Sequence, residues 1–231
     1  MKKTFKKIKN FKANQKKDDN KWSSQMSRII HRILKRDSEW STLMDNEGNF
    51  AMEWGDMTGP VSARMVLSDP KIDLAVLETA RGGLLRAGMG VPDVDVGAVL
   101  NIAADHLGLK GIDTLEQLAE IKRIVVEVAR DCAVLNADDV NVLKMSGYTD
   151  AKTICYVTMN PSHALVREHI RAGGRACALE AGVNGHMVTL YDKGSHIPLM
   201  WTHLIPATME GRALHNVQNA MFAASIAFSL G

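Results

Sequence analysis

Short apolar runs rich in branched residues recur through the middle of the chain and predict buried strands. They lie at 73–78, 96–102, 132–137 and 153–158. Their few polar positions are typical of strands buried on both faces. Because segments with helical periodicity lie between them, the pattern predicts right-handed crossovers and one mostly parallel sheet flanked by helices, an α/β fold.

The clearest helix is predicted at 114–130. Leu115, Leu118 and Ile121 repeat there at helical spacing. Thr114 is the predicted N-cap, and Gln117 three residues later can complete a capping box. A last helix is predicted at about 212–229, where the sequence is again apolar.

The pattern of apolar runs changes between residues 176 and 205. Three strand-like runs are separated there by short turns at 183–185 and 192–194, which predicts a small antiparallel sheet beside the parallel one. Nearer the start, turn residues within 45–60 indicate a hairpin or loop that feeds the core. Residues 26–36 have the spacing of a short amphipathic helix.

Charge is distributed unevenly along the 231 residues. Residues 1–39 contain 13 Lys and Arg against 4 Asp and Glu, whereas the remainder contains 15 basic and 22 acidic residues. We interpret 1–40 as a basic head that is disordered or partly helical, and 41–231 as the folded domain. The head could bind a polyanion, but it contains no recognisable nucleic-acid-binding module, so no specific nucleic-acid partner is expected.

Composition excludes some other classes of protein. No apolar run approaches the roughly 20 residues of a membrane helix, and the lysine-rich start lacks a secretory signal pattern, so we expect a cytoplasmic protein without a membrane partner. Cys132, Cys155 and Cys177 lack the pair spacing of a zinc site or a redox motif. They are predicted to be buried, unpaired residues.

Polar residues at the ends of predicted parallel strands are candidates for a ligand site, because ligands bind beyond the carboxyl ends of such strands. Glu78 could bind Mg²⁺ or simply accept backbone hydrogen bonds. His106 could bind a metal or a phosphate, or cap a turn. Further polar residues expected at this crevice are Asn101, Asp105, Asn136, Asp138 and Asp139, of which the two last could instead cap the following helix.

A glycine-rich segment follows Glu78. Gly82, Gly83, Gly88 and Gly90 predict a flexible loop that a ligand can approach closely. Their spacing does not match G-x-G-x-x-G, so an NAD-binding function is rejected.

Five longer stretches, in order and in register, resemble the Mur-ligase-like module of the cyanophycin synthetase family, within the wider superfamily of Mur ligases and folylpolyglutamate synthetases. They lie at 55–90, 95–122, 133–142, 161–176 and 205–224. The resemblance covers about residues 50–231 and implies the fold of a Mur ligase central domain.

The resemblance also implies roles for particular residues. Glu78 and His106 look like ligands of two Mg²⁺ ions, and Lys122 looks like the lysine that many of these ligases carbamylate, with Lys122 and His106 close to the chemistry. The implied nucleotide contacts are His215, Asn216 and Asn219 to adenine and Arg212 to phosphate. Without the resemblance, Lys122 is interpreted as an exposed helix lysine and the asparagines as helix caps.

The implied activity is that of an ATP-dependent ligase that joins arginine to the aspartate side chains of a polyaspartate backbone through an acyl phosphate. Its partners would be ATP, Mg²⁺, arginine and the aspartate polymer. The chain contains no Gly-Lys followed by Ser or Thr, so the phosphate loop of such ligases is absent from it. We therefore expect a truncated module, without the C-terminal domain, that is inactive alone. The alternatives are a non-catalytic module with a structural or homo-oligomerisation role, and a polyanion binder.

Overall fold

A six-stranded mixed sheet forms the centre of the protein. The computed structural model describes residues 40–44, 50–54, 60–104, 107–108 and 111–231. The sheet order is β4-β5-β6-β7-β8-β9, with β4 to β7 parallel and β7 to β9 antiparallel. The strands are β4 (Val94–Val99), β5 (Ala129–Asn136), β6 (Thr153–Thr158), β7 (Arg175–Gly182), β8 (Gly185–Asp192) and β9 (Ser195–Trp201). The predicted α/β class is confirmed, but the antiparallel strands continue the parallel sheet through β7 instead of forming a separate one.

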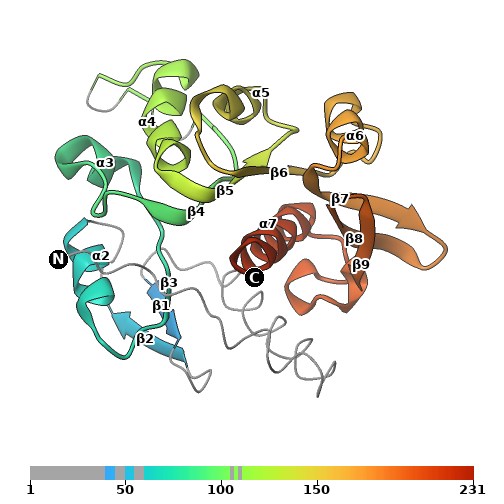
Figure 1. The fold of residues 1–231 in the computed structure, drawn as a ribbon, viewed down its shortest axis with the longest axis horizontal. Coiled ribbons are helices and arrows are strands. Elements are labelled where there is room, and N and C mark those ends of the chain that lie inside the picture. Colours follow the sequence, from blue (N-terminus) through green and yellow to red (C-terminus); the bar gives the residue numbers. More distant parts are fainter. Residues whose placement is uncertain (1–39, 45–49, 55–59, 105–106, 109–110) are drawn as a thin grey trace.

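Helices cover both faces of this sheet (Figure 1). The parallel strands follow one another in chain order, so right-handed crossovers place their connecting helices on the same face. These helices are α4 (Leu115–Glu127), α5 (Val140–Leu143) and α6 (Ala164–Arg171). The opposite face packs against α7 (Leu214–Leu230). Side chains alternate across each strand, so the sheet divides the apolar interior into two cores.

Helix α4 begins as predicted. The Thr114 side chain accepts a hydrogen bond from the Gln117 backbone, and the Gln117 side chain accepts one from the Thr114 backbone, which completes the capping box. The end of α4 lies very close to β4. A Cβ atom added to Gly97 would lie 2.2 Å from the Val125 carbonyl oxygen, so glycine is required for this close packing.

Helix α7 is held at its C-terminal end by polar contacts with residues in the first halves of β5 and β7. Ser229 Oγ lies 3.3 Å from Cys132 Sγ and 3.3 Å from Arg175 Nη1. Arg175 also pairs with Asp192 at 3.0 Å. Cys132, Cys155 and Cys177 are all buried and unpaired, as predicted. Burial raises the pKa of each thiol.

The strand predicted at 73–78 forms, but its predicted neighbours are wrong. It appears as β3 (Leu74–Val76), which pairs antiparallel with β1 (Trp40–Met44) in a second sheet of order β2-β1-β3. The antiparallel partner of β1 on its other side is β2 (Phe50–Trp54), within the predicted hairpin region. An apolar run predicts that a strand is buried, but not which strand lies beside it.

Two shorter helices lie near this second sheet. Val66 of α2 (Pro60–Ser68) packs against Ile72 and Leu77 around β3. The glycine-rich segment predicted as a loop is partly helical, because Gly82 and Gly83 lie inside α3 (Arg81–Ala87), and Gly88 ends this helix with a φ of 65°. The described residues also form short 3₁₀ helices, namely η1 (Lys144–Tyr148), η2 (Thr202–Leu204) and η3 (Pro206–Thr208).

Two predictions concern residues that are not described. The basic head at 1–39, including the predicted amphipathic helix at 26–36, lies outside the described residues.

Among the described helices, none has the length and hydropathy needed to cross a membrane.

Candidate functional site

The carboxyl ends of β4, β5 and β6 are held together by side chains at the end of β5 and just after it. Asn136 is buried, and its Nδ2 donates to the Leu100 carbonyl at 2.7 Å, while its Oδ1 accepts from the Asp138 backbone at 3.0 Å. The prediction that Asn136 faces the crevice is therefore wrong. Its amide is used to hold β4 and β5 at a fixed spacing.

The two aspartates after β5 have different roles. Asp139 caps α5 as predicted, since its Oδ1 accepts from the backbone of Asn141 and Val142, and its Oδ2 accepts from the Ile102 backbone at 2.7 Å. Asp138 is not a cap. It accepts from Thr158 Oγ1 at 2.5 Å and from the Met159 backbone at 2.6 Å, so it ties β5 to the end of β6.

Lys122 projects from α4 toward the carboxyl ends of these strands. Its Nζ lies 3.4 Å from the Asn101 carbonyl oxygen, just beyond the end of β4. The side chain is partly buried, so Lys122 is not a fully solvated surface lysine.

The first turn of α7 also lies at the side of the sheet where the parallel strands have their carboxyl ends. The C-terminal end of α7 contacts Cys132 and Arg175, near the amino-terminal ends of β5 and β7. At 1.5 Å per residue, the 17 residues of α7 span about 25 Å. This length is sufficient to cross the sheet, so the N-terminus of α7 reaches the edge toward which Lys122 points.

Three predicted nucleotide contacts lie in this first part of α7. Asn216 Nδ2 donates to the Ala207 carbonyl at 2.7 Å, which leaves its Oδ1 available as an acceptor. His215 is exposed and Asn219 is half-buried. The N-cap is Ala213, so neither asparagine caps the helix. Arg212 is exposed and forms an ion pair with Glu210.

The predicted metal ligands are less completely described. Glu78 is exposed and lies between β3 and α3, and α3 packs against α4. His106 lies outside the described residues. Within the described part of the chain, no group of three or more His, Cys, Asp and Glu side chains could hold a metal ion. Mg²⁺ needs only one or two carboxylates when phosphates and water supply its other ligands, so the exposed carboxylate of Glu78 fits such an ion.

Sequence reasoning missed a second polar group, on β7, β8 and β9. Glu180 accepts hydrogen bonds from Tyr191 Oη and from His196 Nε2, the latter at 2.9 Å. Partial burial acts to raise the pKa of Glu180, but these two donors outweigh it and hold the pKa below its usual value. Burial and the neighbouring carboxylate raise the pKa of Tyr191. Glu180 is therefore ionised and Tyr191 neutral at pH 7.

We expect Glu180→Gln to reduce stability in a pH-dependent way. The folded-state pKa of Glu180 lies below that of the unfolded chain, so its ionised form stabilises the fold at neutral pH, and this contribution is lost as the pH falls through the folded-state value. Urea unfolding should show a lower midpoint for the variant at pH 7 and a smaller difference below about pH 4. Glu168→Gln, at an exposed position on α6, is the control; a Glu180→Gln difference that is independent of pH would contradict the assignment.

The fold of the domain is similar to that of solved ligase structures. The crystal structure II of MurF from Acinetobacter baumannii superposes with a TM-score of 0.50 and 20% sequence identity, over 90% of this chain and 40% of that one. At this identity the likeness defines the fold. The protein is thus a three-layer α/β domain of the type found in Mur ligases.

The family follows from the sequence comparison. The model of the Mur ligase middle domain matches residues 29–227, and the chain belongs to this family. Cyanophycin synthetase from Trichormus variabilis is 49% identical over 189 residues, and that from Synechocystis sp. is 45% identical over 184 residues. UDP-N-acetylmuramoylalanine–D-glutamate ligase from Desulfitobacterium hafniense is 27% identical over 140 residues, which cover 60% of this chain and 26% of that ligase.

This chain corresponds to only one part of those longer proteins. The matches to the two cyanophycin synthetases cover 78% and 79% of this chain, and 20% of each relative. The chain therefore spans about a fifth of their length.

Proposed function

We propose that this chain is the nucleotide-binding middle module of an ATP-dependent carboxylate–amine ligase of the cyanophycin synthetase type. The observation that carries the proposal is its 41–49% identity to five cyanophycin synthetases. The proposed reaction transfers the γ-phosphoryl group of ATP to an aspartate side-chain carboxylate and releases ADP. The amine of arginine then attacks the acyl carbon, phosphate leaves, and the amine loses a proton to solvent.

The adenine base is proposed to bind at the start of α7. Asn216 supports this role, because a carbonyl can only accept, so the contact with Ala207 requires Nδ2 to be its donor and leaves Oδ1 as the acceptor of the amide. An oriented amide oxygen suits the exocyclic amino group of adenine. His215 and Asn219 are proposed as further base contacts, and Arg212 as a phosphate contact that would exchange Glu210 for the ligand.

The phosphates and Mg²⁺ are proposed to lie between Glu78, His106 and Lys122. Mg²⁺ would neutralise charge on the phosphoryl group during its transfer. Glu78 supplies a carboxylate of the kind that this ion prefers. The Lys122 amino group is proposed to react with CO₂, forming a carbamate and releasing a proton. This modification would turn a cation that opposes Mg²⁺ into an anion that supports it.

Nucleotide binding by the whole chain tests the proposed adenine site. We expect weak, Mg²⁺-dependent binding of ATP in isothermal titration calorimetry, and about fivefold weaker binding for Asn216→Ala, because one hydrogen bond is worth about 1 kcal/mol. Gln218→Ala on the same helix is the matched control and should bind as the parent does. Melting curves of both variants must show that they are folded. Absence of saturable ATP binding by the parent chain would contradict the proposed adenine site.

The same purified chain can be tested for the proposed ligase activity. With ATP, Mg²⁺, arginine and an aspartate-terminated primer, we expect no arginine incorporation by this chain alone, because it contains no Gly-Lys-Ser/Thr phosphate loop. ADP release and arginine uptake are the measurements. Turnover above background that disappears in Glu78→Ala would overturn the expected inactivity, and would at the same time support the metal role of Glu78.

A further inference from the structure

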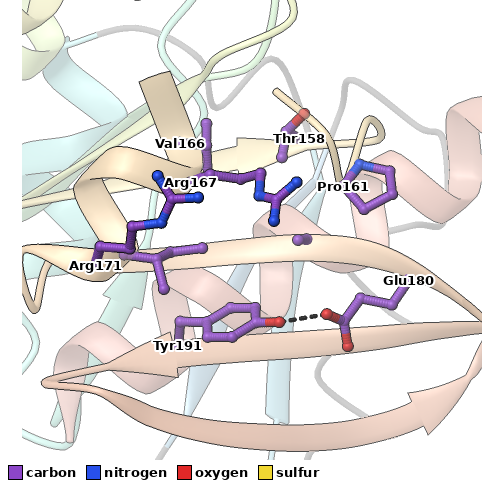
Figure 2. Close-up of a pocket in the computed structure, with 9 residues that line it drawn as sticks. Thr158, Pro161, Val166, Arg167, Arg171, Glu180 and Tyr191 are labelled. Atoms are coloured by element: carbon purple, nitrogen blue, oxygen red, sulfur yellow. Dashed lines mark hydrogen bonds between the residues drawn. The ribbon is translucent and has the colours of Figure 1, made fainter. Parts of the chain in front are cut away.

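A cleft of about 390 Å³ lies between α6 and the sheet. The side chains of β6, β7 and β8 that line it belong to the face covered by α4, α5 and α6, opposite α7, so the cleft is separate from the proposed adenine site. Figure 2 shows two arginines on the α6 side and the Tyr191–Glu180 pair on the sheet side. The lining residues are Thr158, Pro161, Val166, Arg167, Ile170, Arg171, Ala178, Glu180 and Tyr191.

The two arginines give one side of the cleft a strong positive charge. Arg167 and Arg171 are four residues apart and thus project from the same face of α6. Neither forms an ion pair or a side-chain hydrogen bond with any residue that the structure describes, whereas Arg130 on β5 and Arg175 on β7 pair with aspartates. Two like charges at this spacing repel each other, so an anion bound between them would relieve the repulsion.

The opposite side of the cleft carries a negative charge. Glu180 is held in place by Tyr191 from β8 and His196 from β9, and both contacts direct donors at its carboxylate. A carboxylate has about four acceptor positions, so these two bonds leave capacity for another donor. The carboxylate is also fixed in position, because two neighbouring strands supply its partners.

Apolar side chains complete the lining of the cleft. Val166 and Ile170 line the cleft from α6, and Ala178 lines it from β7. The volume is in the range of small-molecule sites, which combine an apolar lining with a few polar groups that orient the ligand. A simple anion would use the arginines but would be repelled by Glu180. A molecule with both charges and an apolar body would satisfy all three parts.

We propose that this cleft binds an α-amino acid, with its carboxylate between Arg167 and Arg171 and its ammonium group at Glu180. The apolar side chain of the ligand would contact Val166, Ile170 and Ala178. This inference goes beyond the proposed ligase function, because the site lies on the face of the sheet opposite α7 and its proposed adenine contacts, and requires neither ATP nor Mg²⁺.

Isothermal titration calorimetry of the whole chain with L-leucine, without nucleotide, tests the proposal. Two probes that each lack one charged group of L-leucine separate the charges: 4-methylpentanoate lacks only the ammonium group, and 3-methylbutylamine lacks only the carboxylate. We expect L-leucine to bind at least tenfold more tightly than either probe. Saturable binding of 4-methylpentanoate as tight as that of L-leucine would overturn the amino-acid assignment, as would the absence of saturable L-leucine binding.

Variants locate the binding. Arg167→Ala and Arg171→Ala should each weaken L-leucine binding about tenfold or more. Glu180→Gln should weaken L-leucine binding but not that of 4-methylpentanoate, a split that a general loss of structure would not produce. Lys144→Ala removes an exposed positive charge outside the cleft and is the control. Equal weakening by Lys144→Ala, or an unchanged affinity in both arginine variants, would overturn the proposed site.

Discussion

Gly97→Ala should destabilise the fold by about 3 kcal/mol, at the upper end of the usual cost of overpacking a core. The added Cβ would lie 2.2 Å from the Val125 carbonyl oxygen and 3.1 Å from the Ala129 Cβ. The first of these atoms belongs to the backbone of α4, so it cannot turn aside as a flexible side chain can. Helix α4 must therefore move away from β4. Urea unfolding followed by circular dichroism measures the loss.

Gly147→Ala is the matched control for this substitution. Gly147 lies in η1, and no atom lies within 4 Å of the position that its Cβ would occupy. Alanine there also restricts the unfolded chain, so we expect unchanged or slightly increased stability. If Gly97→Ala and Gly147→Ala have equal effects, the close packing of α4 on β4 is wrong.

Asp139→Ala should also cost about 3 kcal/mol. Its carboxylate accepts from two backbone groups at the start of α5, and its other oxygen accepts from Ile102 at 2.7 Å. Loss of a helix cap costs about 1 kcal/mol, and loss of a hydrogen bond to a charged group about 1.5–3 kcal/mol. The free energy of unfolding from urea titration is again the measurement.

Two further substitutions separate these contributions. Asp139→Asn keeps a good capping residue but removes the charge that Ile102 contacts, so its effect should be smaller than that of Asp139→Ala. Asp150→Ala, at an exposed position before β6, should have little effect. An Asp139→Ala variant as stable as Asp150→Ala would show that the strand ends do not depend on this carboxylate.

Local patterns predicted the elements of this fold well. The capping box at Thr114, the strands of the six-stranded sheet and the turns between β7, β8 and β9 all have signals within a few neighbouring residues. Gly97 also had a local signal, since a glycine inside an apolar strand marks a close approach. The sequence alone could not show that the atom approaching it is the Val125 carbonyl.

Long-range pairing was the part that local patterns could not predict. The run around β3 was correctly identified as a strand, but it pairs with β1, some 30 residues earlier, and not with the parallel sheet. Asn136 ends a strand as predicted, yet the Leu100 carbonyl, 36 residues away, takes up its amide. Both outcomes depend on which backbone groups meet after folding.

Of the two candidate sites, the sequence indicated one and gave almost no sign of the other. Resemblance to a known family pointed to Lys122 and Asn216, and their contacts with Asn101 and Ala207 lie near the strand ends. The cleft beneath α6 was missed because its lining comes from β6, α6, β7 and β8. The only local signal was the spacing of Arg167 and Arg171, which also occurs on ordinary exposed helices.

The three cysteines provide a built-in reporter of unfolding. They occupy β5, β6 and β7 within the core beneath α7, and burial raises the pKa of each thiol. Reagents that react with thiolates are thus excluded from the native chain both by access and by protonation. Because the thiols share one core, opening of α7 exposes them together, and mass spectrometry after a pulse of alkylating reagent counts opened molecules directly. The chain needs no introduced dye for this measurement.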